Sequence, residues 1–166
     1  LIKLSKKYDN NIFKNAKSIL VSKEEISEAS RMCTREFHIA IKTAVKRITN
    51  YQKKLVPKTT FFIDSLGVKL GCIWSPLSSC GLYVPGGKAL YPSSVLMNAI
   101  PAKIAGVKRI VITTPAINNK VRPEILVAAK AANISEIYKI GGAQAVAALA
   151  FGTETVKKVD KIVGPG

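Results

Sequence analysis

The second half of the chain alternates between short β-branched runs and longer apolar stretches, and this alternation limits the fold more than any other feature. Strand-like runs end at Tyr83, Thr114 and Ile140, and a fourth covers residues 161–163. Helix-like stretches lie between them. Alternation at these lengths indicates parallel strands joined by crossover helices. The sequence therefore predicts an α/β fold.

Glycine-rich turns follow three of these strands. They are Gly86-Gly87, Gly141-Gly142 and Gly164-Pro165-Gly166. The carboxyl ends of parallel strands share one edge of a sheet, and ligands of open α/β folds bind there. Because glycine permits positive φ and lets the backbone approach a ligand closely, we expect the three turns to form part of a binding site.

Two side chains accompany these turns as candidate ligand contacts. Tyr83 directly precedes the first turn, so its ring could stack on a flat ligand or pack in a core. Gln144 falls in the first turn of a helix predicted over residues 143–151. Its amide could hold a ribose or a pyrophosphate beside the free N–H groups of the helix start, or it could cap its own helix or face solvent. No GxGxxG is present, so the usual dinucleotide fingerprint gives no support.

Residues 1–58 predict a helical segment. Ser22 and Glu25 form a capping box, which predicts a helix beginning at Lys23. A second helix is predicted from residue 35 to about 54, where apolar residues recur at steps of three and four. The single histidine, His38, lies one residue off that face and is interpreted as an ordinary helix residue. The predicted apolar face comprises Phe37, Ile41, Ala44 or Val45, Ile48, Tyr51 and Leu55.

A β-hairpin is predicted next, because strand-like residues 61–63 and 68–74 flank the turn formers at 64–67. Two strands of a larger sheet would fit the same pattern. Cys72 and Trp74 are interpreted as packing residues of this region. A buried helix is predicted over residues 93–105, which carry almost no polar side chains.

Composition restricts the class of protein. The chain has 166 residues, enough for one domain with a real core, and a formal net charge of +16. Its lysines are scattered singly, and no aromatic and basic stripe is present, so a basic nucleic-acid-binding module stays an alternative without motif support. A second alternative is a non-catalytic relic that keeps the fold.

The cysteines and the hydropathy pattern address location and metals. Three cysteines without CxxC spacing and one histidine disfavour a zinc site built from this chain alone. Neither a signal peptide nor a membrane span is found, so we expect no membrane partner and a cytoplasmic, reducing location.

Several blocks of the sequence together resemble one family. They are GLYVPGG (81–87), YPSSVLM (91–97), IPAKIAGV (100–107), GGAQA (141–145), AALAFGTE (147–154) and VDKIVGPG (159–166). These blocks are similar to histidinol dehydrogenase, and the similarity runs in order from about residue 61 to the last residue. Long blocks at matching separations make the resemblance specific.

The resemblance implies an enzyme of histidine biosynthesis that oxidises L-histidinol to L-histidine through the aldehyde, with NAD and zinc as cofactors. It also implies a homodimer when full length. By position, Tyr83 and Gln144 match residues of the family that contact NAD. The family's next NAD contact, its metal ligands and its catalytic Glu-His pair fall beyond residue 166. We therefore expect no catalytic and no metal-binding residue here, and no turnover by this piece alone.

The expected architecture is an incomplete Rossmann-like parallel sheet with crossover helices, preceded by N-terminal helices and a β-hairpin. Residues 1–58 would form the N-terminal helical segment. Residues 59–166 would form an NAD-binding α/β domain that is truncated at its C-terminal end.

Overall fold

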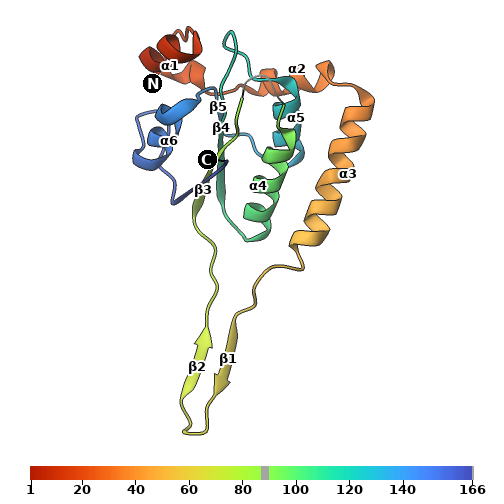
Figure 1. The fold of residues 1–166 in the computed structure, drawn as a ribbon, viewed down its shortest axis with the longest axis vertical. Coiled ribbons are helices and arrows are strands. Elements are labelled where there is room, and N and C mark those ends of the chain that lie inside the picture. Colours follow the sequence, from red (N-terminus) through yellow and green to blue (C-terminus); the bar gives the residue numbers. More distant parts are fainter. Residues whose placement is uncertain (87–89, 166) are drawn as a thin grey trace.

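A four-stranded parallel sheet forms the centre of the protein. The computed structural model describes residues 1–86 and 90–165. The strand order is β5-β4-β3-β6, with every pairing parallel. This confirms the predicted α/β sheet (Figure 1). The strands are β3 (Ser79–Tyr83), β4 (Arg109–Thr113), β5 (Ile137–Tyr138) and β6 (Lys161–Val163).

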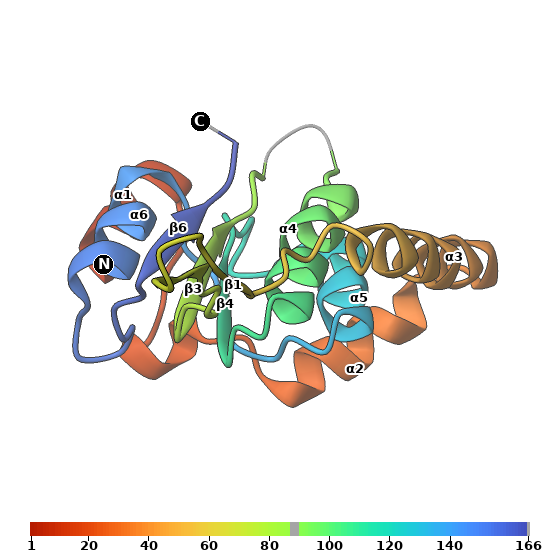
Figure 2. The ribbon, with the colours of Figure 1, turned by 90° about the horizontal axis from the view of Figure 1, so that it is seen from below.

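Crossover helices cover both faces of the sheet. α4 (Pro92–Ile104) connects β3 to β4 and α5 (Pro123–Ala131) connects β4 to β5, and both lie on the same face. α6 (Gly142–Phe151) leads from β5 towards β6 across the opposite face (Figure 2). The prediction of strands joined by crossover helices is confirmed.

Alternate residues of each strand point to opposite faces of the sheet and contribute to two separate hydrophobic cores, as the two-residue period of a strand requires. On the side of α4 and α5, the buried strand residues include Leu82 and Ile112. On the side of α6 they include Val111 and Tyr138. The sheet is therefore buried on both faces, which explains its continuous apolar runs.

The N-terminal helices pack outside this sandwich. They are α1 (Ile2–Asp9), the short 3-10 helix η1 (Ala16–Ile19), α2 (Lys23–Met32) and α3 (Arg35–Gln52). α2 packs on α5 and α3 packs on α4 (Figure 2). The predicted capping box is present, since Glu25 N–H donates to Ser22 Oγ at 3.2 Å and Ser22 N–H donates to Glu25 Oε2 at 2.8 Å.

Residues 19–21 lie along the outer edge of β5 and extend the sheet by a short antiparallel pairing. Val21 N–H donates to the Ile137 carbonyl at 2.8 Å, and Lys139 N–H donates to the Ile19 carbonyl at 2.8 Å. We predicted a strand over residues 136–140, but β5 is only two residues long. The prediction was too long because Lys139 pairs with the N-terminal segment and not with β4.

The predicted hairpin is confirmed and projects from the body as an arm. β1 (Thr60–Ile63) and β2 (Lys69–Cys72) pair antiparallel, and the arm extends beyond the amino end of β3 (Figure 1). Its side chains do not join either core. The packing role predicted for Cys72 and Trp74 is therefore wrong, because Cys72 is exposed and Trp74 is 58% exposed.

Two helices bury fewer of their apolar side chains than the sequence predicts. Tyr51 and Leu55, at the end of the predicted α3 face, are 62% and 55% exposed, because the chain there leaves the body for the arm. α4 buries Leu96 among others, but Met97 is 53% exposed. In the part of the chain that the structure describes, no helix is long and apolar enough to span a membrane.

A polar cluster ties the loop before β6 to β4 and β5. Arg109 donates to Glu136 through Nε and Nη2, at 2.9 and 2.7 Å, and through Nη1 to the Lys158 carbonyl at 3.0 Å. The Tyr138 hydroxyl lies 3.1 Å from Glu136 Oε1 and 3.1 Å from the Thr155 carbonyl. Burial, helped by the negative charge of Glu136, raises the pKa of Tyr138 to about 12.

This raised pKa predicts a loss of stability at alkaline pH. The unfolded tyrosine ionises near pH 10, so the folded state holds its proton more tightly, and stability falls as the pH rises from about 10 to about 12. At pH 11 we expect the free energy of unfolding to fall by about 1.4 kcal/mol from this group. In urea unfolding, Tyr138→Phe should lack that share of the loss, whereas Tyr8→Phe, at an exposed position, should keep it. An equal loss in parent and Tyr138→Phe would contradict the assignment.

Candidate coenzyme site

The glycine turns lie at the carboxyl edge of the sheet, as the sequence predicts. Gly86 follows β3, Gly141 follows β5 and Gly164 follows β6. The other two glycines named for this edge, Gly87 and Gly166, lie outside the described residues.

Pro115, directly after β4, holds two of these turns together. A methyl group on Gly86 would lie 3.0 Å from Pro115 Cβ, and one on Gly141 would overlap Pro115 Cγ. Gly141 must therefore be glycine for the proline ring to fit beside it, whereas a side chain at Gly86 would require the ring to shift by a few tenths of an ångström. From the sequence we expected a strand-like run that ends at Thr114 and gave the proline after it no role. Its place directly after a strand, matching Pro85 after β3, is the signal that could have revealed it.

Tyr83 lies at the point where the sheet changes its winding direction. The chain passes from β3 to β4 and β5 on one side, and α6 then brings it back across the other face to β6. Ligands of open α/β sheets bind at such a switch point. Gly164 packs directly on Tyr83, because a methyl group there would lie 2.6 Å from the Tyr83 carbonyl oxygen.

Tyr83 and Gln144 come together at the start of α6. Gly142 N–H donates to the Tyr83 hydroxyl at 3.1 Å. The Gln144 side chain folds back over the same residue, since a methyl group on Gly142 would lie 2.8 Å from Gln144 Oε1. The two candidate residues are thus neighbours at the carboxyl edge of the sheet, as their predicted positions require. We call this part of the edge, formed by Tyr83, Gly142 and Gln144, the rim.

The Gln144 amide is the unusual group of this rim. Its Nε2 is buried and has no hydrogen-bond partner within residues 1–86 and 90–165. Gly141 occupies the N-cap position and has no side chain to cap α6, and the Tyr83 hydroxyl accepts from the first N–H of the helix, that of Gly142. A buried amide without a partner is costly, so this donor favours an acceptor supplied by a ligand. The start of α6 also attracts negative charge.

The alternatives considered from the sequence can now be compared with the geometry. Tyr83 is half-buried and packs partly against the core on the α6 side, so its ring is only partly available. Gln144 does not cap its own helix. Thr113, at the end of β4, contributes a buried hydroxyl oxygen that also has no partner among the described residues. Together these groups suit a ligand with a flat ring and several hydrogen-bond acceptors.

Metal-binding groups are not gathered in the described ranges. Residues 1–86 and 90–165 contain no group of three or more His, Cys, Asp or Glu side chains that could hold a metal ion. His38 sits on α3, where its Nε2 lies 2.9 Å from the Ser30 carbonyl oxygen.

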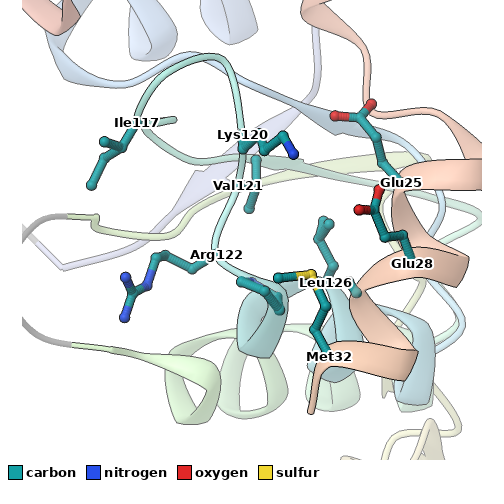
Figure 3. A pocket seen from close by; sticks show the side chains of 10 residues that line it. Glu25, Glu28, Met32, Ile117, Lys120, Val121, Arg122 and Leu126 are labelled. Carbon is teal, nitrogen blue, oxygen red and sulfur yellow. The ribbon is translucent and has the colours of Figure 1, made fainter.

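A pocket of about 240 Å³ lies away from this rim, between α2 and the loop that enters α5 (Figure 3). Glu28 and Met32 border it from α2, and Val121 borders it from the loop. Glu25, on the same wall, already receives hydrogen bonds from the buried Lys139 ammonium at 3.0 and 3.1 Å. Neither Tyr83 nor Gln144 lines this pocket, so it is distinct from the candidate site.

Comparison with known proteins decides the family. The sequence model of one protein family, described as histidinol dehydrogenase, matches residues 1–166. The chain belongs to the histidinol dehydrogenase family. Histidinol dehydrogenase 1 of Trichormus variabilis is 55% identical over 141 residues, which cover 85% of this chain and 33% of that protein. Histidinol dehydrogenase of Agrobacterium fabrum is 50% identical over 162 residues, covering 98% of this chain and 37% of that protein.

A solved structure of the same family shares the fold. Histidinol dehydrogenase from Elizabethkingia anophelis superposes with a TM-score of 0.94 at 38% sequence identity, covering 100% of this chain and 38% of that chain. The family resemblance found in the sequence is therefore confirmed. The chain spans about a third of the length of the curated histidinol dehydrogenases that it matches.

The backbone conformation of Gly142 predicts that a side chain at this position lowers the free energy of unfolding. This residue has a φ of +67°, so Gly142→Ala should lower the free energy of unfolding by about 1 kcal/mol. Gly67→Ala is the matched control, because Gly67 has a φ of +79° and open space around its Cα. We expect similar losses in urea unfolding, because the Gln144 amide at the end of a flexible side chain can move aside. A loss several kcal/mol larger for Gly142→Ala would show that the Gln144 side chain is rigidly held.

Proposed function

We propose that this chain is the coenzyme-binding part of an NAD-dependent histidinol dehydrogenase, and that Tyr83 and Gln144 contact the NAD. The unpartnered Gln144 amide beside the Tyr83–Gly142 hydrogen bond is the observation that carries the proposal. Family membership supplies the reaction, and the switch-point position of Tyr83 supports the site.

Each part of the rim has a definite task in this proposal. The Tyr83 ring stacks on a flat group of the coenzyme, and the Gln144 Nε2 donates to an oxygen of its ribose or pyrophosphate. The start of α6 favours the negative charge of the pyrophosphate. Bound NAD supplies the acceptor for the hydride that leaves the substrate.

The longer protein would oxidise L-histidinol to L-histidine through the aldehyde, as a homodimer with zinc. The described residues do not fit a zinc site, because their His, Cys, Asp and Glu side chains form no cluster. We propose that the zinc ligands and the catalytic acid-base pair lie outside this chain, as the family resemblance implies. Removal of a hydride from an alcohol also requires a positioned base that takes the hydroxyl proton.

Titration of the 166-residue chain with NAD tests the coenzyme contacts. Gln144→Met keeps the length of the side chain but removes the amide, and we expect about a tenfold loss of affinity. Tyr83→Ala should weaken binding by a similar factor, whereas Tyr83→Phe should retain most of the ring's contribution. Ligand-observed NMR is suited to the weak binding expected of an incomplete site. Gln52→Met and Tyr51→Ala on α3 are the remote controls. Unchanged affinity in both Gln144→Met and Tyr83→Ala would rule out the site.

A turnover assay tests whether the catalytic groups lie outside this chain. With histidinol, NAD and zinc, we expect the 166-residue chain to form no NADH above the rate without protein. A rate that rises in proportion to protein concentration, and survives repurification, would show that catalytic groups lie within this chain.

A further inference from the structure

The pocket between α2 and the loop that enters α5 carries opposite charges on its two walls. The Glu28 carboxylate extends from α2 towards the loop, and the Lys120 ammonium extends from the loop towards α2 (Figure 3). Within residues 1–86 and 90–165, neither group belongs to an ion pair. The cavity therefore has an acidic wall and a basic wall, each with a charge that has no ionic partner in that part of the chain.

The two other charged side chains that line this pocket already have partners. Glu25 accepts from the buried Lys139 ammonium at 3.0 and 3.1 Å. Arg122 Nε lies 3.9 Å from Glu124 Oε2, and the guanidinium points away from α2 (Figure 3). One charge on each wall is thus available to a ligand.

Apolar side chains form much of the remaining lining. Ala29, Val121 and Leu126 are buried, and Met32 is 65% exposed at the border of the pocket. A thioether side chain is flexible and adapts to the shape of an apolar group. The pocket therefore suits a ligand that carries both charges at one end and is apolar at the other.

Hydrogen bonds hold the loop wall in place. Asn11 is completely buried, its Nδ2 donates to the Ala116 carbonyl at 2.8 Å, and its Oδ1 accepts from the Asn119 N–H at 2.8 Å. The Asn119 side chain makes two further hydrogen bonds with the Ile12 backbone, both of 2.8 Å. Because this wall is fixed before a ligand arrives, binding requires little further ordering of the chain.

We propose that this pocket, which we call the amino-acid pocket, binds a small α-amino acid with an apolar side chain. The ammonium group of the ligand pairs with Glu28, its carboxylate pairs with Lys120, and its side chain packs on the buried apolar lining. A ligand with only one of the two charges would leave the charge on the opposite wall without a partner. The combination of an acidic wall, a basic wall and an apolar base thus selects a zwitterion.

The volume of the pocket sets the size of the ligand. An apolar protein cavity of about 150 Å³ holds benzene, which has six non-hydrogen atoms. By proportion, about 240 Å³ suits a molecule of about nine or ten non-hydrogen atoms, which is the size of leucine. Glu28 and Lys120 are exposed to solvent, so each ionic contact is screened and the Kd should be roughly 1 mM.

Ligand-observed NMR with the 166-residue chain and L-leucine tests the class of ligand. We expect saturable binding. 4-Methylpentanoate has the same carbon skeleton without the ammonium group, and 3-methylbutylamine has the leucine side chain and ammonium group without the carboxylate. Each should bind about fivefold more weakly than leucine, because each loses one ionic contact.

Variants that remove one charge assign the contacts. Glu28→Gln and Lys120→Gln should each weaken leucine binding about fivefold. Glu36→Gln and Lys46→Gln on α3 are the matched controls, because they make the same changes of charge at exposed positions that do not line this pocket. The controls should change the Kd by less than about twofold. Urea unfolding establishes that each variant is folded.

Three results would overturn the proposal. They are the absence of saturable leucine binding, equal binding of leucine and 4-methylpentanoate, and an unchanged leucine Kd in both Glu28→Gln and Lys120→Gln.

The amino-acid pocket does not depend on the proposed coenzyme site, because neither Tyr83 nor Gln144 lines it. Leucine should bind equally well to Tyr83→Ala with Gln144→Met, and NAD should not displace it. Displacement of leucine by NAD would place leucine at the rim and overturn the amino-acid pocket. Failure of NAD binding with intact leucine binding would refute only the coenzyme site.

Discussion

The parallel pairing of β3 with β4 on one side and β6 on the other positions the helices and turns of this structure. A methyl group on Gly81, in the middle of β3, would lie 2.9 Å from Leu149 Cδ1 of α6. A side chain at this position would displace the Leu149 side chain, so glycine allows α6 to pack closely on the sheet. Close packing of α6 brings its first turn, with Gln144, against the Tyr83 side chain at the end of the same strand. One missing side chain in the core thus sets the geometry of the rim.

Side-chain hydrogen bonds hold β6 in this arrangement from its amino end. The backbone N–H and the hydroxyl of Ser79 both donate to Asp160 Oδ2 at 2.8 Å, and these bonds hold the pKa of Asp160 below its usual range. Arg109 binds the loop just before this aspartate through its carbonyl contact with Lys158. Because β6 has only three residues, these side-chain contacts supplement a short ladder of backbone hydrogen bonds.

Periodicity and local capping account for what the sequence predicted correctly. The apolar runs that end at Tyr83 and Thr114 are buried on both faces, and such runs are recognisable without tertiary information. The Ser22–Glu25 capping box depends on four consecutive residues, so it too is local. The rim position of Tyr83 and Gln144 followed from the rule that parallel strands end at a common edge. Their contact with NAD stays a prediction, and so does the division of the chain at residue 58.

The errors arose where distant segments meet or separate. The short length of β5 depends on residues 19–21, more than a hundred positions earlier in the chain. The wedge formed by Pro115 depends on two turns from other strands. Trp74 looks like a core residue by composition, and only the course of the arm away from the body reveals its exposure. No local pattern encodes the pairing of residues 19–21 or the course of the arm, and the place of Pro115 after a strand marks the residue without revealing the two turns that it contacts.

The antiparallel pairing of residues 19–21 with β5 has a consequence for growth of the sheet. That flank is closed, whereas the far side of β6 has no strand beside it within residues 1–86 and 90–165. The free edge of β6, beside the switch point, is therefore one place where a further strand can lengthen the ladder. A strand added there would shield the open backbone amides of β6 and bring its own side chains next to Tyr83, so it would complete the hydrogen bonding of the sheet and enlarge the proposed coenzyme site together.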